Sequence, residues 1–137
     1  SSIQFYEDQL VVPSLTVLAE DPSPRAGIAK RFEMVIESMT SPGRRCGCLL
    51  ANSTLELGAR DPAVAKKLAA TQSRIEKAYA QAIERGQAAG EIDSAASAKS
   101  LAHYIMACLM GIVCLSKAGS DASKLREIAA TAMRAIA

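Results

Sequence analysis

The hydrophobic pattern of the chain is helical almost throughout, and it is densest in the segment LAHYIMACLMGIVCL. A helix that is apolar on every side has to be covered on every side, so we predict a central helix here. One stripe at helical spacing carries mostly large side chains: Leu101, Ile105, Cys108, Ile112 and Leu115. A second stripe is mostly small: Tyr104, Ala107, Gly111, Cys114 and Ala118. We expect the first stripe to fill the core and the second to admit the close approach of another helix.

A membrane-spanning helix is the alternative interpretation of this segment. Crossing a bilayer takes roughly 18 to 20 apolar residues. The apolar run is shorter than that, contains His103 and ends at Ser116 and Lys117. We therefore expect no membrane contact.

Five further helices are predicted by apolar spacing and by the residues that start and stop helices. The first helix runs from Ile3 to about Ala19, and Pro13 either kinks it or marks the start of its second half. The second helix lies between the breaks at 21–24 and 41–43. The third runs from about Cys46 to Ala59. The fourth helix runs from Asp61-Pro62 to Gly90. The central helix begins at a cap, Asp93 or Ser94, and ends at Gly119. The last helix begins at a cap, Ser120 or Asp121. No segment alternates long enough for a strand, so the pattern predicts an all-α fold of about six helices.

Length and composition add limits on size, partners and compartment. A chain of 137 residues is one domain by size, and a net charge of +2 is too small to indicate a nucleic acid or anionic membrane as its partner. Two of the four cysteines lie inside the predicted central helix, which is typical of free thiols in the cytoplasm. The chain begins with Ser1 and enters a helical pattern at once, so we expect a piece of a longer protein.

The sequence contains no combination of residues that indicates catalysis, a metal or a cofactor. It has no Ser-His-Asp order, phosphate loop or nucleotide fingerprint. His103 is the only histidine, and Cys46 and Cys48 alone do not supply the four ligands of structural zinc. We expect no enzyme activity, no metal and no cofactor.

Two stretches carry a family resemblance: RCGCLLANSTLELGARDP at 45–62 and IERGQAAGEI at 83–92. They resemble the C-terminal ligand-binding and dimerisation domain of the TetR family of bacterial transcriptional regulators. The resemblance implies a TetR-like regulatory fold in which the last two helices form a four-helix dimer interface. It also implies a parent protein that binds DNA through an N-terminal helix-turn-helix, for which this chain has no segment. Cys46, beside the family-like Cys48, departs from the pattern.

The resemblance further implies a small hydrophobic or aromatic effector inside the helical domain. Candidate lining residues are mainly apolar with a few polar anchors: Phe5, Gln9, Phe32, Ile36, Cys48, Asn52, Glu56, Tyr79, His103, Met106 and Met110. Asn52 and Glu56 share a helix face with Cys48, and they either contact a ligand or join two helices by a hydrogen bond. For His103, a polar role at the edge of the core or a satisfied position within it is favoured over contact with the pocket or the interface.

The expected partner of the chain is a second copy of itself. The predicted interface comprises Tyr104, Ala107, Gly111, Cys114 and Ala118 near the twofold axis, with Leu125, Ile128 and Ala132 from the last helix. By the resemblance, an effector in the core shifts the first helix and so alters operator affinity in a repressor.

Two other functions remain open from the sequence. One is a helical dimerisation or interaction domain that binds no ligand. The other is a thiol-based redox sensor, because Cys46 and Cys48 lie at a predicted helix N-terminus next to Arg44 and Arg45, where the thiolate is favoured.

Overall fold

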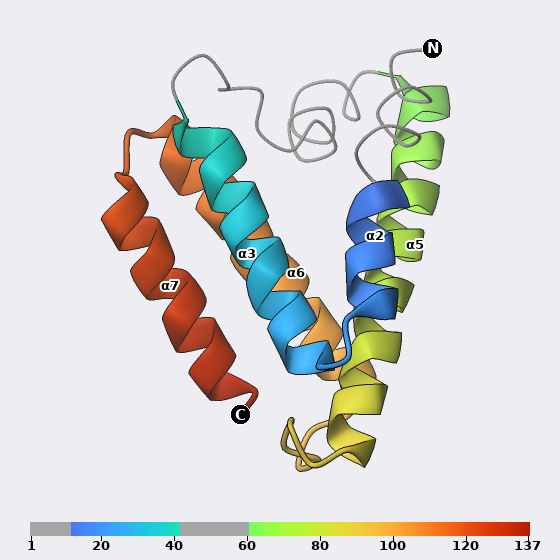
Figure 1. The fold of residues 1–137 in the computed structure, drawn as a ribbon. Coiled ribbons are helices and arrows are strands. Elements are labelled where there is room, and N and C mark those ends of the chain that lie inside the picture. Colours follow the sequence, from blue (N-terminus) through green and yellow to red (C-terminus); the bar gives the residue numbers. More distant parts are fainter. Residues whose placement is uncertain (1–11, 42–60) are drawn as a thin grey trace.

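The computed structural model describes residues 12–41 and 61–137 (Figure 1). These residues form the helices α2 (Val12–Glu20), α3 (Pro24–Thr40), α5 (Pro62–Ala88), α6 (Ala98–Lys117) and α7 (Ala122–Ala135). Neither described range contains a strand, so the all-α prediction is confirmed. The predicted helix at 46–59, and the part of the first predicted helix before Val12, lie outside the described residues.

Local capping signals set most of the helix ends. The Asp61 side chain accepts a hydrogen bond from the Ala63 N–H at the start of α5, and Asp121 does the same for Lys124 at the start of α7. These carboxylates satisfy N–H groups that have no partner within the helix. Gly90 and Gly119, which follow α5 and α6, have φ angles of 78° and 101°, a conformation that glycine adopts without strain. The four predictions at these positions are confirmed.

The predicted start of α6 at Asp93 or Ser94 is wrong, because α6 is capped by Ser97. The preceding segment is held in a non-helical path by contacts with other elements. The Asp93 N–H donates to the Ile136 carbonyl at 3.3 Å, and the Gln87 amide donates to the carbonyls of Asp93 and Ala96 at 3.0 and 2.9 Å. The two carbonyls that accept from Gln87 are ones that a helix capped by Asp93 would have used for its own hydrogen bonds.

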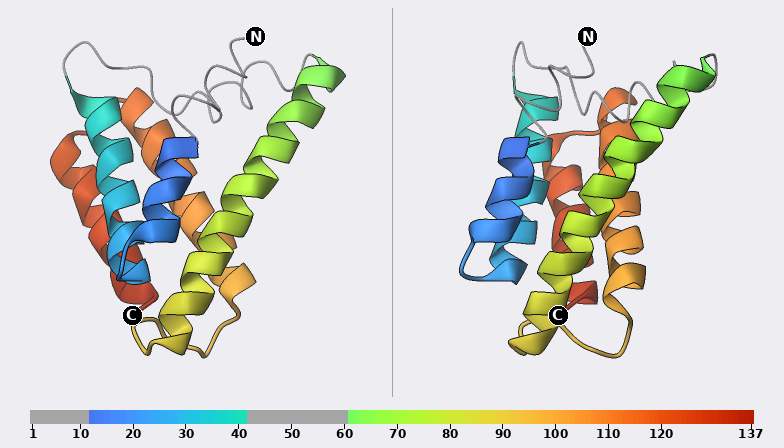
Figure 2. Two further views of the ribbon diagram at one scale, coloured as in Figure 1. Left: turned by 45° about the vertical axis from the view of Figure 1, so that its right-hand side comes forward. Right: turned by 90° about the vertical axis from the view of Figure 1, so that its right-hand side faces the viewer.

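Helix α3 is in contact with each of α2, α5, α6 and α7, so it is the hub of the described part of the bundle. Helices α5 and α6 pack extensively near the connection between them and diverge toward their other ends (Figure 2). The core between the helices includes Phe32, Tyr79, Ile83 and Ile105, each at most 1% exposed. Burial of side chains of this size contributes roughly 1.5 to 3 kcal/mol each before entropic costs are counted.

The two predicted stripes of helix α6 differ in burial. Ile105 and Ile112 are fully buried, whereas Ala107, Cys114 and Ala118 are exposed. The described part of a single protomer therefore covers only one side of this helix. By length and composition α6 could also cross a membrane, but core helices of soluble proteins pass the same test, and α6 packs against α3, α5 and α7.

Candidate functional site

The structure brings together some of the predicted ligand-lining residues. Phe32 and Ile36 of α3 and Tyr79 of α5 are buried in the main core. Met106 is half-buried against the same core, and Met110 packs on a smaller cluster formed by Met39 and Val113. The other predicted lining residues apart from His103 lie outside the described residues: Phe5, Gln9, Cys48, Asn52 and Glu56. Cys46, the partner of Cys48 in the redox hypothesis, also lies outside them.

His103 is at the surface, unlike Phe32, Ile36 and Tyr79, which lie in the interior. Its side chain is 54% exposed, and its Nε2 lies 2.6 Å from Oε1 of Glu76. This contact joins α6 to α5 on the outside of the bundle. His103 therefore has a polar contact at the edge of the core, the role that the sequence favoured for it, and its contact with an effector stays a prediction.

A buried tyrosine and an arginine form a polar pair between α3 and α5. The Nε–H of Arg31 donates to the hydroxyl of Tyr79 at 3.2 Å. Tyr79 is 0% exposed and Arg31 is half-buried. Tyr79 is among the lining residues that the sequence predicts, and Arg31 is not. Arg31 follows Ile28 by three residues and precedes Val35 by four, and this spacing on the buried side of a helix was the available signal.

Two other arginines reach between helices, and both end on backbone carbonyls. Arg25 Nη1 donates to the Met133 carbonyl and Arg85 Nη2 to the Leu18 carbonyl, each at 2.8 Å. Met133 and Leu18 lie in the last turns of α7 and α2, where carbonyls lack helical partners and the helix dipole is negative. These arginines therefore stabilise the ends of helices.

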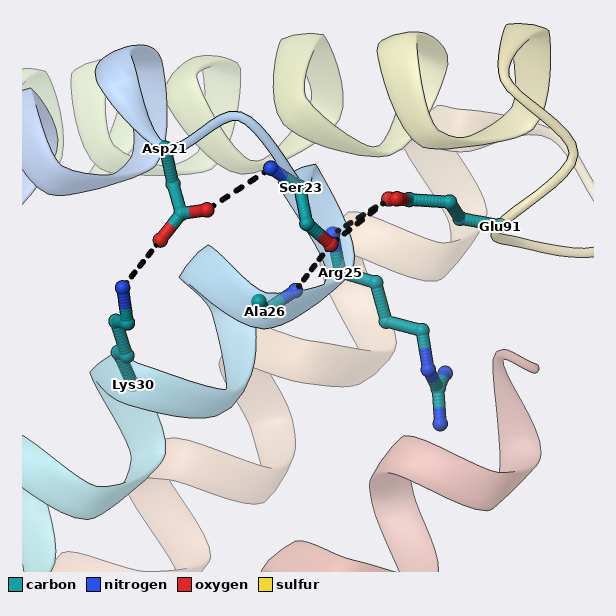
Figure 3. A network of polar contacts seen from close by, with 6 residues as sticks. All are labelled: Asp21, Ser23, Arg25, Ala26, Lys30 and Glu91. Carbon is teal, nitrogen blue, oxygen red and sulfur yellow. Dashed lines mark hydrogen bonds and ion pairs between the residues drawn. The ribbon is translucent and has the colours of Figure 1, made fainter.

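The corner between α2 and α3 is held by Asp21. One carboxylate oxygen accepts from the Ser23 N–H at 2.9 Å, and the other lies 2.6 Å from Nζ of Lys30 (Figure 3). The hydrogen bond from Lys30, followed by that from the Ser23 backbone, lowers the pKa of Asp21 from its usual 3.8. The corner is thus stabilised by ionised Asp21.

Ser23 and Glu91 fasten this corner to the connection between α5 and α6. The Ser23 hydroxyl accepts from the Ala26 N–H and donates to Oε1 of Glu91, both at 3.1 Å (Figure 3). The Arg25 N–H also donates to Oε1 of Glu91, at 3.3 Å. A carboxylate at a helix N-terminus is favoured by the helix dipole. The C-terminal end of α2 is therefore tied to both α3 and the α5–α6 connection.

A hollow of about 520 Å³ lies at the opposite end of α3. It is lined by Met39, Thr40, Ser116, Lys117, Gly119, Ser120, Asp121 and Ala122. None of the predicted ligand-lining residues that the structure describes contributes to it.

The small-residue stripe of α6 forms an open face. Tyr104 is 40% exposed, and a Cβ added to Gly111 would meet none of the described atoms within 4 Å. A hydrogen bond with the Cys108 side chain and, to a smaller extent, partial burial raise the pKa of Tyr104. Across the described ranges, no three His, Cys, Asp or Glu side chains are grouped so that they could hold a metal ion.

The predicted contribution of α7 to an interface needs a correction. Leu125 and Ala132 are 0% and 1% exposed because they pack in the core of their own protomer. A partner could not contact them unless the core opened. Ile128 is half-buried, so part of its side chain remains accessible to a partner.

Comparisons with known proteins agree with this architecture. The family described as "Tetracyclin repressor-like, C-terminal domain" matches residues 24–133. The solved structure of the TetR family transcriptional regulator CifR, a cysteine mutant complexed with 26-bp double-strand operator DNA, aligns with a TM-score of 0.85 at 23% identity. The alignment covers 98% of this chain and 70% of that chain, and it shows that the two share a fold. No curated protein matches the sequence. The match over most of the chain establishes that this protein belongs to the TetR family and corresponds to its C-terminal regulatory domain.

Proposed function

We propose that this chain is the effector-sensing and dimerisation domain of a cytoplasmic, DNA-binding transcriptional repressor. The domain is not catalytic. It binds a small molecule in its interior, pairs with a second copy through α6 and the edge of α7, and reaches DNA through an N-terminal domain outside this sequence. The operator DNA bound by CifR supports DNA as the partner of the whole regulator.

The observation that carries this proposal is the division of α6 into a core side and an open side. Ile105 and Ile112 pack inside the protomer, and the exposed side carries Ala107, Gly111 and Cys114. Small side chains allow the close approach of a partner helix. Because the same helix contributes to the interior and to the proposed interface, a molecule bound in the interior would affect the geometry of the dimer.

Helix α2 is the proposed output element. Its C-terminal end is fixed by the bond from Arg85 to the Leu18 carbonyl and by the Asp21 corner. A helix fixed at one end responds to a molecule bound beside it mainly by tilting. The opposite end of α2 leads toward the N-terminal part of the chain, where TetR-family regulators carry their DNA-binding domain.

Thermal melting against a panel of hydrophobic and aromatic compounds tests the proposal. A specific effector stabilises the folded state by about 2.7 kcal/mol when its free concentration is 100 times its dissociation constant. We expect a few related compounds to raise the melting temperature at low concentration. A dimer whose melting temperature no compound changes would contradict sensing and favour a ligand-free dimerisation domain.

A further inference from the structure

We propose that the effector carries a carboxylate and that Arg31, positioned by Tyr79, binds it. The inference rests on the proposed sensing function and specifies the chemical class of the effector. It starts from the place of Arg31 in the bundle. Arg31 lies beside Phe32 on α3 and reaches Tyr79 on α5, and both aromatic side chains are at most 1% exposed. A positive charge on a half-buried side chain is thus placed beside a largely apolar contact between two helices.

The charge of Arg31 is not balanced by any carboxylate in the part of the chain that the structure describes. The acidic side chains of Asp21, Glu33 and Glu76 pair with other residues. Glu91 accepts its bonds from Ser23 and Arg25. A guanidinium group taken partly out of water without a counter-charge is costly, so an arginine that has no described carboxylate partner at this position needs another reason to be there.

Arg31 also differs from the two arginines that stabilise the fold. Arg25 and Arg85 donate to carbonyls at the negative ends of helices. Arg31 donates to a phenol, which is a neutral group, and it does so in the middle of α3. Its interaction therefore orients the guanidinium without neutralising it.

The hydrogen bond with Tyr79 uses Nε of Arg31, and no described residue accepts from its two terminal nitrogens. These nitrogens form a planar fork that matches the two oxygens of a carboxylate. The side chain is half-buried, so part of it can be reached by a small molecule.

Matched pairs of acids and alcohols test the inference. We would measure dissociation constants by calorimetry for benzoate and benzyl alcohol, 4-phenylbutyrate and 4-phenylbutan-1-ol, and octanoate and octan-1-ol. At least one acid should bind the wild type more tightly than its alcohol. Arg31→Met should weaken binding of that acid by about 10- to 100-fold, the range expected for a charge-assisted hydrogen bond, and leave the alcohol nearly unchanged. Arg126→Met, which removes an equal charge from an exposed ion pair with Glu33, should leave the acid preference intact.

The outcomes separate this inference from the sensing function. If acids and alcohols bind equally and Arg31→Met changes neither, the carboxylate inference is wrong and sensing stands. If none of the six compounds binds, and the wider panel also gives no melting shift, both fail. Arg31→Lys provides a second variant should Arg31→Met not fold. It keeps the positive charge and loses the two parallel N–H donors of the guanidinium, so it should lower the affinity for the acid by a smaller factor than Arg31→Met does.

An internal partner for Arg31 is the rival explanation, and Glu56 is the acidic residue among the predicted lining positions. If Glu56 neutralised Arg31, then Arg31→Met and Glu56→Gln would each destabilise the ligand-free protein, and the double variant would be no less stable than either single one. This non-additivity would overturn the inference. We expect Arg31→Met to leave the urea midpoint of the ligand-free protein unchanged or higher, because it removes an uncompensated charge.

Discussion

Ser23 and Glu91 are 68 positions apart in the sequence, yet the Ser23 hydroxyl donates a 3.1 Å hydrogen bond to Oε1 of Glu91. The same hydroxyl caps α3 by accepting from the Ala26 N–H. One side chain therefore joins the start of a helix to the connection between two others. This double role predicts that the corner below α2 is more sensitive to mutation than an ordinary helix cap.

Ser23→Ala should destabilise the protein by about 1 to 2 kcal/mol, because it removes a cap and leaves Glu91 with a single donor. Ser97→Ala is the matched control, since the Ser97 hydroxyl caps α6 by accepting from the Ser100 N–H and has no carboxylate partner among the described residues. The free energy of unfolding in urea measures both. Equal losses for the two variants would show that the contact with Glu91 contributes nothing.

The ion pair of Asp21 with Lys30 predicts a dependence of stability on pH. The pKa of Asp21 is lowered in the folded state, so its contribution is present above the unfolded pKa of about 3.8 and is lost as the pH falls through the lower folded value. Asp21→Asn should thus be less stable than the wild type at pH 6, and the two should converge in acid. Urea unfolding between pH 6 and pH 2 measures the difference. A difference that stays constant over this range would contradict the role of the ionised carboxylate.

His103→Ala should have a small effect on stability and none on effector binding. The contact between His103 and Glu76 is at the surface, and exposed ion pairs typically contribute about 0 to 1 kcal/mol. Urea unfolding and calorimetric titration of the variant check the two parts. A tenfold loss of effector affinity would show that His103 contacts the effector.

The position of Cys114 allows a direct test of the proposed twofold axis. A variant with Cys46, Cys48 and Cys108 replaced by Ser, Ser and Ala retains only Cys114, which is exposed on the open side of α6. A short bismaleimide should convert this variant to a covalent dimer. A control with Cys114→Ser and a single cysteine at the exposed Ser73 of α5 should remain largely monomeric on a denaturing gel. Equal cross-linking of the two would place the twofold axis elsewhere.

The ends of the helices were largely predictable from the sequence, because caps act over three or four residues. Asp61 and Asp121 start α5 and α7, and Gly90 and Gly119 follow α5 and α6, as the sequence indicates. The start of α6 was not predictable in this way. Asp93, Ser94 and Ser97 could each serve as the cap, and contacts with distant groups, such as the hydrogen bond from the Asp93 N–H to the Ile136 carbonyl, select Ser97.

The functional residues were predictable only in part. Hydrophobic spacing indicates that one face of a helix is buried, but it does not indicate whether the same chain or a partner covers that face. Leu125 and Ile128 both lie on the apolar face of α7, yet only Leu125 is fully inside the protomer. His103 interrupts an apolar run, so the sequence also allowed an internal role for it. Its contact with Glu76 could not be predicted from this run, because Glu76 lies on another helix. Arg31 was overlooked because a charged residue is usually assigned to solvent, and its partner Tyr79 is 48 positions away.

Sedimentation of the wild type and of Gly111→Leu tests the central claim most directly, namely that a second copy covers the open side of α6. A Cβ added at Gly111 has no described neighbour within 4 Å from the rest of its own chain, so leucine should leave folding intact and overpack only an interface. We predict a wild-type species of twice the 14.4 kDa chain mass, and dissociation to the monomer in Gly111→Leu with unchanged helical circular dichroism. A monomeric wild type, or a dimer that is equally stable with leucine at this position, would contradict the account.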